Sequence, residues 1–453
     1  MVNVYGSRGA RVFVSVSALS AASLAASAGS PTVSNTLGTP GFSSGYAAAF
    51  AVHDDGAGEM LYMTGTAGIA GSPQIARWNG AAWEGVGGGL IGGFSNILAT
   101  FQGDLIAGGY FDSANGVAGT AKLARWDGAQ WNSMDAQSEI FLNSVWDLQV
   151  WNDGSGEKLF VAGNYIDIGG AGGPDHLAAW DGSSYEAVGA TIGGAVPLIV
   201  LDLQVADLGD GEKLYAGGRF LNIDGVPANN IAVYDGTTWE PMGTGLLPSS
   251  GFAQIITMTT FDDGNGPAVY VGGTFATAGG TPARNVAKWD GTSWSAMDTG
   301  LAATVQELTV FDDGNGPALY ASGNFETATG GINHIAKWNG TSWEQVLAGA
   351  NANVFGAIVY DAGEGEALHF GGSFTSGLGA FSNRVVSLVA ADTGGRNPAD
   401  LAEPFDVLDL ADVQGFAAAF VAQDPIADVA QPEGVLDLAD VAAFVDAFRA
   451  GCP

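Results

Sequence analysis

Carboxylate and amide side chains recur at one place in a repeated sequence pattern. When the repeats are aligned, Asp147, Asp202 and Glu307 fall at the same point of the first expected strand of three units. Gln149 and Gln204 follow two residues later, on the same side of the strand. Such groups can line a pocket for a polar ligand, and paired carboxylates at a suitable separation can cleave glycosides. Alternatively, they are buried, hydrogen-bonded carboxylates that tie strands together.

The histidines offer a second kind of chemistry. His176 and His334 occupy the same repeat position. Other units carry a different polar residue there: Gln74, Lys122, Asn230 and Asn285. A position that accepts such varied residues indicates a polar strand end rather than a metal site. The sequence contains no metalloprotease, nucleophile-elbow, Walker or paired-cysteine motif.

Two acidic loops, 262–266 and 312–316, share the sequence Asp-Asp-Gly-Asn-Gly. Closely spaced carboxylates are typical of calcium loops. However, both loops lie between the first and second expected strands of their units, so the sequence favours hairpin tips.

A six-residue box organises the strands that carry these residues. It is clearest at 289–294, where Asp290-Gly291 follows one tryptophan and a second tryptophan comes five positions after the first. Close copies stand at 78–83, 126–131, 180–185, 234–239 and 338–343. Asp-Gly and Asn-Gly favour tight hairpins. We expect the two aromatic rings of each box to face each other across a pair of strands.

A glycine-rich landmark followed by an aromatic residue precedes each box. Full copies occur at 108–111, 162–165, 217–220, 272–275, 322–325 and 371–374, and a worn copy at 64–67. The full copies recur about every 50 residues, which is typical of repeat architectures. Each unit is predicted to form four strands; in the sixth these are 305–311, 318–322, 334–338 and 343–347. An alanine always stands two positions before the box, which suits closely stacked sheets.

The last unit lacks a fourth strand, and the N-terminal region supplies a match for it. Residues 34–39 follow the same pattern as the fourth strand at 239–244. A strand from the N-terminus would close the ring and leave no open sheet edge. The sequence therefore predicts an all-β, seven-bladed β-propeller over residues 30–391, with an N-terminal strand closing the last blade.

Segments 214–218, 233–235 and 239–242 resemble the kelch and galactose-oxidase-like propellers. This resemblance covers most of residues 40–390 and implies fold far more than activity. The copper-radical oxidases of that family use a tyrosine cross-linked to a cysteine. Cys452 is the only cysteine and lies outside the propeller, so that chemistry is not expected.

Composition restricts the partners and the location. The net charge of −33, from 47 acidic and 14 basic residues, argues against binding nucleic acid or anionic lipid. Residues 1–28 have the basic start, apolar run and Ala-Ser-Ala ending of a signal peptide. No later stretch has the length of a membrane span. We expect a secreted or cell-surface protein.

The C-terminal region has a different composition. Residues 392–398 are expected to be a linker, and 399–453 contain an acidic duplication in which each half continues into a helical pattern. This two-helix module resembles a dockerin, more narrowly the GC-type dockerin of exported bacterial proteins. The resemblance implies calcium ligands at Asp400, Asp409, Asp412, Asp428, Asp437 and Asp440. Two further ligand positions of each loop are lost, so the same carboxylates can instead cap the helices.

These observations lead to two functional hypotheses. The first is an exported, non-enzymatic propeller that serves as a binding or structural module, with a glycan or peptide as the candidate ligand at its face and with no organic cofactor. The resemblance to dockerins implies that a cohesin-like or envelope protein holds its tail. The second is a secreted carbohydrate-active enzyme, a polysaccharide hydrolase or lyase with the same tail. Most residues obey the repeat rather than break it, which favours binding.

Overall fold

A computed structural model describes residues 31–34, 36–38, 45–66, 71–134, 144–169, 173–189, 191–194, 198–326, 332–363 and 365–390. They belong to one compact unit, Ser30–Ala391. The expected signal peptide, the linker and the C-terminal module lie outside the described residues. So do its six carboxylates, Asp400, Asp409, Asp412, Asp428, Asp437 and Asp440. The described part is all-β and antiparallel, apart from one 3-10 turn, η1 (Thr36–Gly38).

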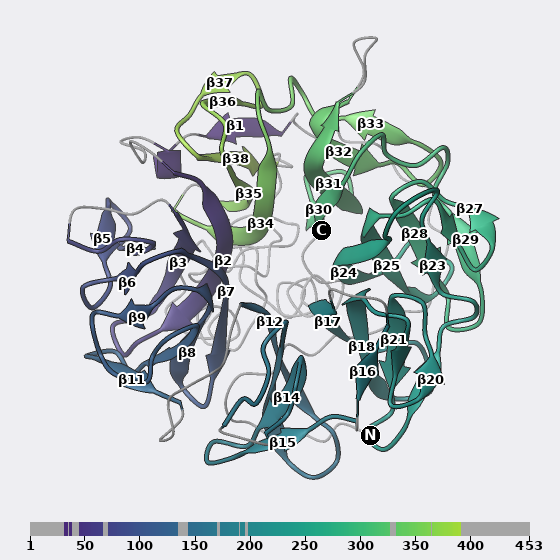
Figure 1. Ribbon diagram of the computed structural model, residues 1–453. Helices are drawn as coiled ribbons and strands as arrows, with labels where there is room; N and C mark the ends of the chain where they lie inside the picture. The colour runs from purple at the N-terminus through teal and green to yellow at the C-terminus, as the bar shows by residue number, and fades with distance from the viewer. Residues whose placement is uncertain are drawn as a thin grey trace, which may run out of the picture. The chain divides into compact units, whose positions relative to one another are not determined.

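Seven four-stranded sheets make up this part of the chain (Figure 1). The first three are β2 (Ala47–Asp54), β3 (Glu59–Gly65), β4 (Ile75–Trp78), β5 (Trp83–Gly85); β7 (Phe94–Phe101), β8 (Asp104–Tyr110), β10 (Leu123–Trp126), β11 (Trp131–Ser133); and β12 (Val145–Asn152), β13 (Glu157–Gly163), β14 (Leu177–Trp180), β15 (Tyr185–Ala187). The next two are β17 (Ile199–Asp207), β18 (Glu212–Arg219), β21 (Ile231–Tyr234), β22 (Trp239–Pro241); and β24 (Gln254–Asp262), β25 (Pro267–Thr274), β28 (Val286–Trp289), β29 (Trp294–Ala296). The last two are β30 (Val305–Asp312), β31 (Pro317–Glu326), β32 (Asn333–Trp338), β33 (Trp343–Gln345); and β34 (Val354–Asp361), β35 (Glu366–Gly372), β38 (Val385–Val389), β1 (Thr32–Ser34).

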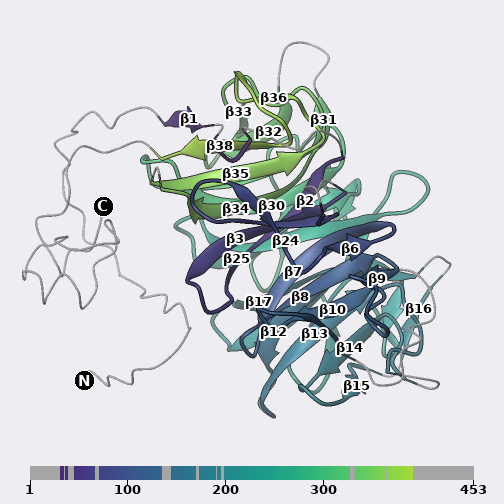
Figure 2. The same cartoon turned by 90° about the vertical axis from the view of Figure 1, so that its left-hand side faces the viewer.

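The first strand of each sheet lies at the centre. These inner strands contact one another in the order β2, β7, β12, β17, β24, β30 and β34, and β34 contacts β2 again. The sheets therefore follow one another around a closed circle, as seen down its axis in Figure 1 and from the side in Figure 2. Buried side chains from neighbouring sheets pack together in the spaces between them.

Short additional strands form within the connections from the second to the third strand and from the fourth strand to the next sheet. They are β6 (Leu90–Ile91) with β9 (Ser113–Ala114); β16 (Ile192–Gly193) with β19 (Asn222–Ile223) and β20 (Val226–Pro227); β23 (Leu246–Leu247) with β26 (Thr277–Ala278) and β27 (Thr281–Pro282); and β36 (Ser376–Gly377) with β37 (Ala380–Phe381). Both kinds of connection leave the sheets on the same side, opposite the hairpins that join strands one to two and three to four.

The aromatic box forms the hairpin between the third and fourth strands, as predicted. Trp289 pairs with Trp294, and their ring centroids are 5.1 Å apart. Between them, Asp290 Oδ1 accepts the backbone N–H groups of Thr292 and Ser293 at 2.8 and 2.7 Å. Gly291 has φ +95°, a conformation that suits glycine. The local sequence is therefore sufficient to specify this hairpin.

The acidic loops are hairpin tips, as the sequence favours. Asp312 Oδ1 accepts the backbone N–H groups of Gly314 and Gly316, both at 2.9 Å, and Asp262 does the same with Gly264 and Gly266. Within the residues that the structure describes, no group of three or more His, Cys, Asp or Glu side chains is placed to hold a metal ion.

The glycine landmarks allow adjacent sheets to approach closely. A Cβ atom on Gly272 would lie 2.6 Å from Cγ1 of Val305, on the inner strand of the next sheet. The alanine two positions before the box is fully buried in every unit: Ala76, Ala124, Ala178, Ala232, Ala287 and Ala336. Small residues at these positions thus let the sheets stack, as expected from the sequence.

The N-terminal strand completes the seventh sheet, although its bounds differ from the prediction. β1 pairs with β38 through Thr32–Val389 and Ser34–Ser387, so the strand ends where residues 34–39 were expected to begin it. The chain then turns into η1 because Ser34 Oγ accepts the backbone N–H of Thr36 at 3.2 Å. The fourth strand of the sixth sheet is also shorter than predicted, since it ends at Gln345.

Candidate functional site

Each inner strand carries a β-bulge near its start, and the bulge positions the candidate residues. The register shifts between Val145 and Asp147, and likewise before Asp202 and Glu307. The residue after the bulge in the seven sheets is Ala49, Ile97, Asp147, Asp202, Thr257, Glu307 or Gly356. Bulges redirect side chains. Here they place polar groups on four consecutive sheets and small or apolar groups on the other three.

These polar groups connect neighbouring sheets. Asp147 Oδ2 accepts the backbone N–H of Leu203 at 2.7 Å, and Thr257 Oγ1 accepts that of Leu308 at 3.1 Å. In each case the donor lies directly after the corresponding bulge position of the next sheet. The inner strands therefore run side by side in matching register. The hydrogen bond of Asp147 thus matches the second alternative from the sequence, in which buried carboxylates tie neighbouring strands together.

The three carboxyl groups also form one electrostatic cluster. Burial raises the pKa of Asp202 well above its ordinary value, and the charges of Asp147 and Glu307 raise it further. Burial, followed by the charge of Asp147, raises the pKa of Glu307 to about 8. Burial likewise raises the pKa of Asp147, against the opposing effect of the Leu203 N–H. Carboxyl groups with such raised pKa values retain protons near neutral pH and can donate hydrogen bonds.

One atom of the cluster lacks a partner. Asp202 Oδ2 is buried and makes no hydrogen bond within the described residues. The two glutamines differ, because the Nε2 groups of Gln149 and Gln204 donate to the carbonyls of Val150 and Val205 at 3.0 and 2.7 Å. The structure thus brings Asp147, Asp202 and Glu307 together, whereas the amide Nε2 groups bond to their own strands.

Aromatic residues near the starts of the inner strands were missed by the sequence analysis. The rings of Tyr46 and Phe355 lie 5.0 Å apart, and those of Phe94 and Trp146 6.3 Å apart. Each pair joins two neighbouring sheets. Tyr110 adds a ring 5.7 Å from Phe94. Trp146 and Phe355 are each the extra residue of a bulge. An alignment of the repeats puts both at the same position, and this shared position could have identified them from the sequence.

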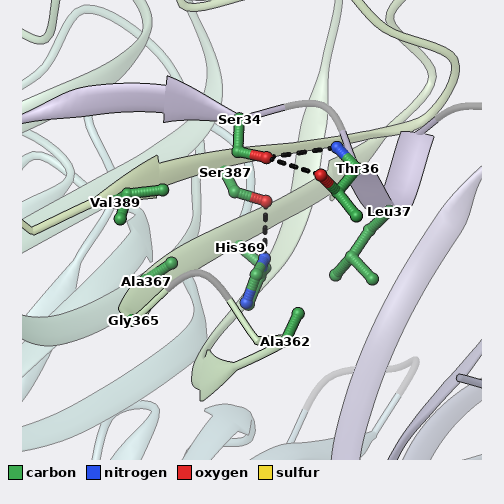
Figure 3. A pocket seen from close by; sticks show the side chains of 9 residues that line it. All are labelled: Ser34, Thr36, Leu37, Ala362, Gly365, Ala367, His369, Ser387 and Val389. Carbon is green, nitrogen blue, oxygen red and sulfur yellow. Dashed lines mark hydrogen bonds between the residues drawn. The ribbon is translucent and has the colours of Figure 1, made fainter. Parts of the chain in front are cut away.

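His53, His334 and His369 are buried, and His176 is partly buried. His369 lies beside a small cavity under the N-terminal strand, lined also by Ser34, Leu37 and Ser387 (Figure 3). Its Nε2 lies 2.8 Å from the Tyr360 carbonyl, which can only accept, so Nδ1 accepts from Ser387 Oγ at 2.6 Å. Both ring nitrogens are therefore used in structural hydrogen bonds.

The same place in other sheets holds an ion pair. In the sixth sheet Asp313 Oδ2 accepts from Tyr320 Oη at 2.8 Å and from Lys337 Nζ at 2.5 Å. The fifth sheet repeats this arrangement with Asp263, Tyr270 and Lys288. In the last sheet, His369 stands in the place of the tyrosine and Ser387 in the place of the lysine. The His176 and His334 positions both have positive φ, as do Gln74, Lys122, Asn230 and Asn285 in the other units.

Comparison with known proteins gives little about function. No protein-family model matches the chain, and no curated protein matches it. Among the solved structures that resemble it are two of the extracellular domain of BT4673 from B. thetaiotaomicron. One is described as a one component system (TM-score 0.46, 8% identity, 76% of this chain) and the other as a hybrid two component system (TM-score 0.48, 8% identity, 80% of this chain). The chain spans 38% and 39% of their lengths. Similarity at this level carries no argument on function.

Among the helices of the described residues, none has the length and apolar character needed to cross a membrane.

Proposed function

We propose that residues 30–391 form a seven-bladed β-propeller that acts as an exported binding module. Its ligand would bind at the end of the ring where the inner strands begin; we call this end the mouth. The ring of seven sheets, closed by β1, supports the propeller assignment. A rigid ring suits binding, because it holds side chains from several sheets at fixed positions.

The carboxyl cluster is the observation that carries this proposal. Asp147, Asp202 and Glu307 come from three different sheets, and Asp202 Oδ2 has no partner in the described part of the chain. Buried carboxyl oxygens normally have hydrogen-bond partners. A polar ligand at the mouth would supply one.

Binding can be tested by calorimetry with the full chain and panels of oligosaccharides and peptides. We expect at least one ligand to bind, and Asp202→Asn to weaken it about tenfold, because a hydrogen bond to a charged or buried group contributes on the order of 1.5 kcal/mol. Glu240→Gln, an exposed change on β22, is the matched control. If Asp202→Asn leaves every affinity unchanged, the mouth is not the ligand site.

One observation favours the second hypothesis, a polysaccharide hydrolase or lyase. Glu307 has a pKa of about 8, and a general acid needs a raised pKa. Release of reducing sugar from polysaccharides, lost in Glu307→Gln, would establish the enzyme. Absence of turnover together with retained binding would leave the binding module.

We propose further that residues 399–453 act as a dockerin-like anchor for a cohesin-like or envelope protein, with calcium bound by Asp400, Asp409, Asp412, Asp428, Asp437 and Asp440. The support is the duplicated acidic sequence. Capture of one specific partner by the full chain, lost with a chelator or in the Asp412→Ala and Asp440→Ala double variant, is the expected result. Capture that is unchanged by both treatments would exclude calcium.

A further inference from the structure

The ring has two chemically different faces. All nine exposed large apolar residues among those described lie at one side of the sheets, eight on the connections and Tyr110 at the end of β8: Ile91, Tyr110, Val117, Ile166, Leu221, Leu247, Phe252, Leu347 and Phe381. The opposite face carries the hairpin tips with Asp54, Asp207, Asp262, Asp312 and Asp361. The mouth opens on the apolar face, because the inner strands begin there.

Aromatic rings line this mouth. We define the aromatic rim as Tyr46, Phe94, Tyr110, Trp146, Phe252 and Phe355. Phe252 precedes the inner strand β24 and is 54% exposed, and Tyr110 is 43% exposed. Trp146 Nε1 has no hydrogen-bond partner in the described chain. The rim therefore combines two exposed rings with four half-buried ones and a buried N–H donor that no described group uses.

Basic side chains pair with carboxylates on both faces of the ring. On the hairpin face Lys288 lies 2.6 Å from Asp263, and near the rim Lys122 lies 3.5 Å from Asp112. At the rim, Lys122 Nζ lies 4.0 Å from the centroid of Tyr110, and the Arg219 guanidinium lies 5.6 Å from that of Phe252. These cations lie over rim rings, where cation–π attraction is favourable.

Aromatic faces next to carboxyl groups fit a particular class of ligand. A pyranose ring presents C–H groups on its faces and hydroxyls around its edge. The faces can stack on rim rings, and the hydroxyls can hydrogen-bond to Asp202 and Glu307. An anionic sugar would be repelled by the acidic chain as a whole, whereas the protonated carboxyl groups of the cluster can bond to neutral hydroxyls.

We propose that the mouth binds an uncharged oligosaccharide, stacked on the aromatic rim and hydrogen-bonded to the carboxyl cluster. This inference rests on the proposed binding function and specifies its ligand class.

The test is calorimetric titration of the full chain with uncharged hexasaccharides of glucose, xylose and mannose. Oligogalacturonate, chitosan hexamer and a mixed peptide library serve as charged and non-sugar probes. At least one uncharged hexasaccharide should bind, and Tyr110→Ala and Phe252→Ala should each weaken it by tenfold or more. Leu347→Ala removes an exposed apolar side chain of the same face that is not part of the rim, and should leave the affinity unchanged.

The outcomes separate the ligand class from the proposed function. If only a charged sugar or a peptide binds, and Tyr110→Ala abolishes that binding, the mouth is a ligand site but the inference of an uncharged sugar is wrong. If no probe binds, or if the affinity is unchanged in Tyr110→Ala, Phe252→Ala and Asp202→Asn, both the inference and the proposed site are wrong. An equal loss in Leu347→Ala would indicate a general apolar surface and would also overturn the inference.

Discussion

The indole N–H of Trp83 donates a hydrogen bond of 2.8 Å to the main-chain carbonyl of Leu37. Trp83 belongs to the first sheet, whereas Leu37 follows the strand that completes the seventh. Trp294 donates in the same way to Met242 of the preceding sheet at 2.8 Å, and Trp239 to Val188 at 3.2 Å. In these three boxes the second aromatic residue therefore has two functions: it pairs within its hairpin and joins its sheet to the one before.

Trp294→Phe should destabilise the ring. The change keeps an aromatic partner for Trp289 but removes one of the two donors to the Met242 carbonyl, the other being the Gly245 N–H; the loss should cost about 1 kcal/mol in the free energy of unfolding. Urea unfolding measures this cost. Trp343→Phe is the matched control, because Trp343 Nε1 has no partner among the described residues. Equal losses in the two variants would contradict the role of the hydrogen bond.

Stability should fall as the pH rises through the range in which Glu307 titrates. The folded protein holds its proton up to about pH 8, whereas the unfolded chain releases it near the ordinary pKa of 4.5. Between these values the native state binds more protons, so the free energy of unfolding decreases with pH, by on the order of 3 kcal/mol.

In Glu307→Gln this pH dependence should be smaller, with the remainder contributed by Asp147 and Asp202, and the stability of the variant relative to wild type should be higher at pH 8 than at pH 5. Thermal unfolding at both pH values gives the comparison. Glu240→Gln should retain the wild-type profile, since Glu240 is exposed. An unchanged profile in Glu307→Gln would contradict the buried, protonated state.

Gly272→Ala should destabilise by about 1–3 kcal/mol, because the added methyl group overpacks the contact with Val305. Val305→Ala in the same chain removes the obstructing Cγ1 atom. The double variant should therefore lose less stability than the sum of the two single changes, as measured by a double-mutant cycle in urea. Simple additivity would show that the two residues do not compete for space.

Removal of residues 31–38 should expose the edge of β38 and break the contact between Leu37 and Trp83. We expect a lower melting temperature and concentration-dependent association, because an unpaired edge strand invites pairing with another chain. Calorimetry and light scattering measure these effects. Replacement of the same eight residues by a Gly-Ser sequence of equal length controls for chain length and should behave like the deletion. Wild-type behaviour in either variant would contradict a closing role for β1.

Local features of this fold could be predicted from the sequence. The hairpin at Trp289–Trp294 depends on neighbouring residues, so its turn and ring pair were expected correctly. Leu37 was aligned with Met242, and both carbonyls do accept an indole N–H from the next sheet. The strand bounds were wrong because Ser34 begins a 3-10 turn, a local hydrogen-bonding detail that the repeat pattern does not encode.

The candidate site was only partly predictable. The repeat alignment identified Asp147, Asp202 and Glu307, but not that their pKa values depend on one another across sheets. The aromatic rim was missed because its contacts join different sheets: Tyr46 with Phe355 links the first sheet to the seventh, and Phe94 with Trp146 links the second to the third. Such pairs depend on the circular order of the sheets, which no single repeat contains.

The pairing of β1 with β38 has a consequence for the order of folding. Contacts within each of the first six sheets are local in sequence, so these sheets can form as their own segments are completed. The seventh sheet instead needs β1 and β38, the first and last strands of the described residues, and closing so long a loop costs considerable entropy. Ring closure is therefore the slowest step that this topology predicts, and until it occurs β1 must remain unpaired while six sheets are already in place.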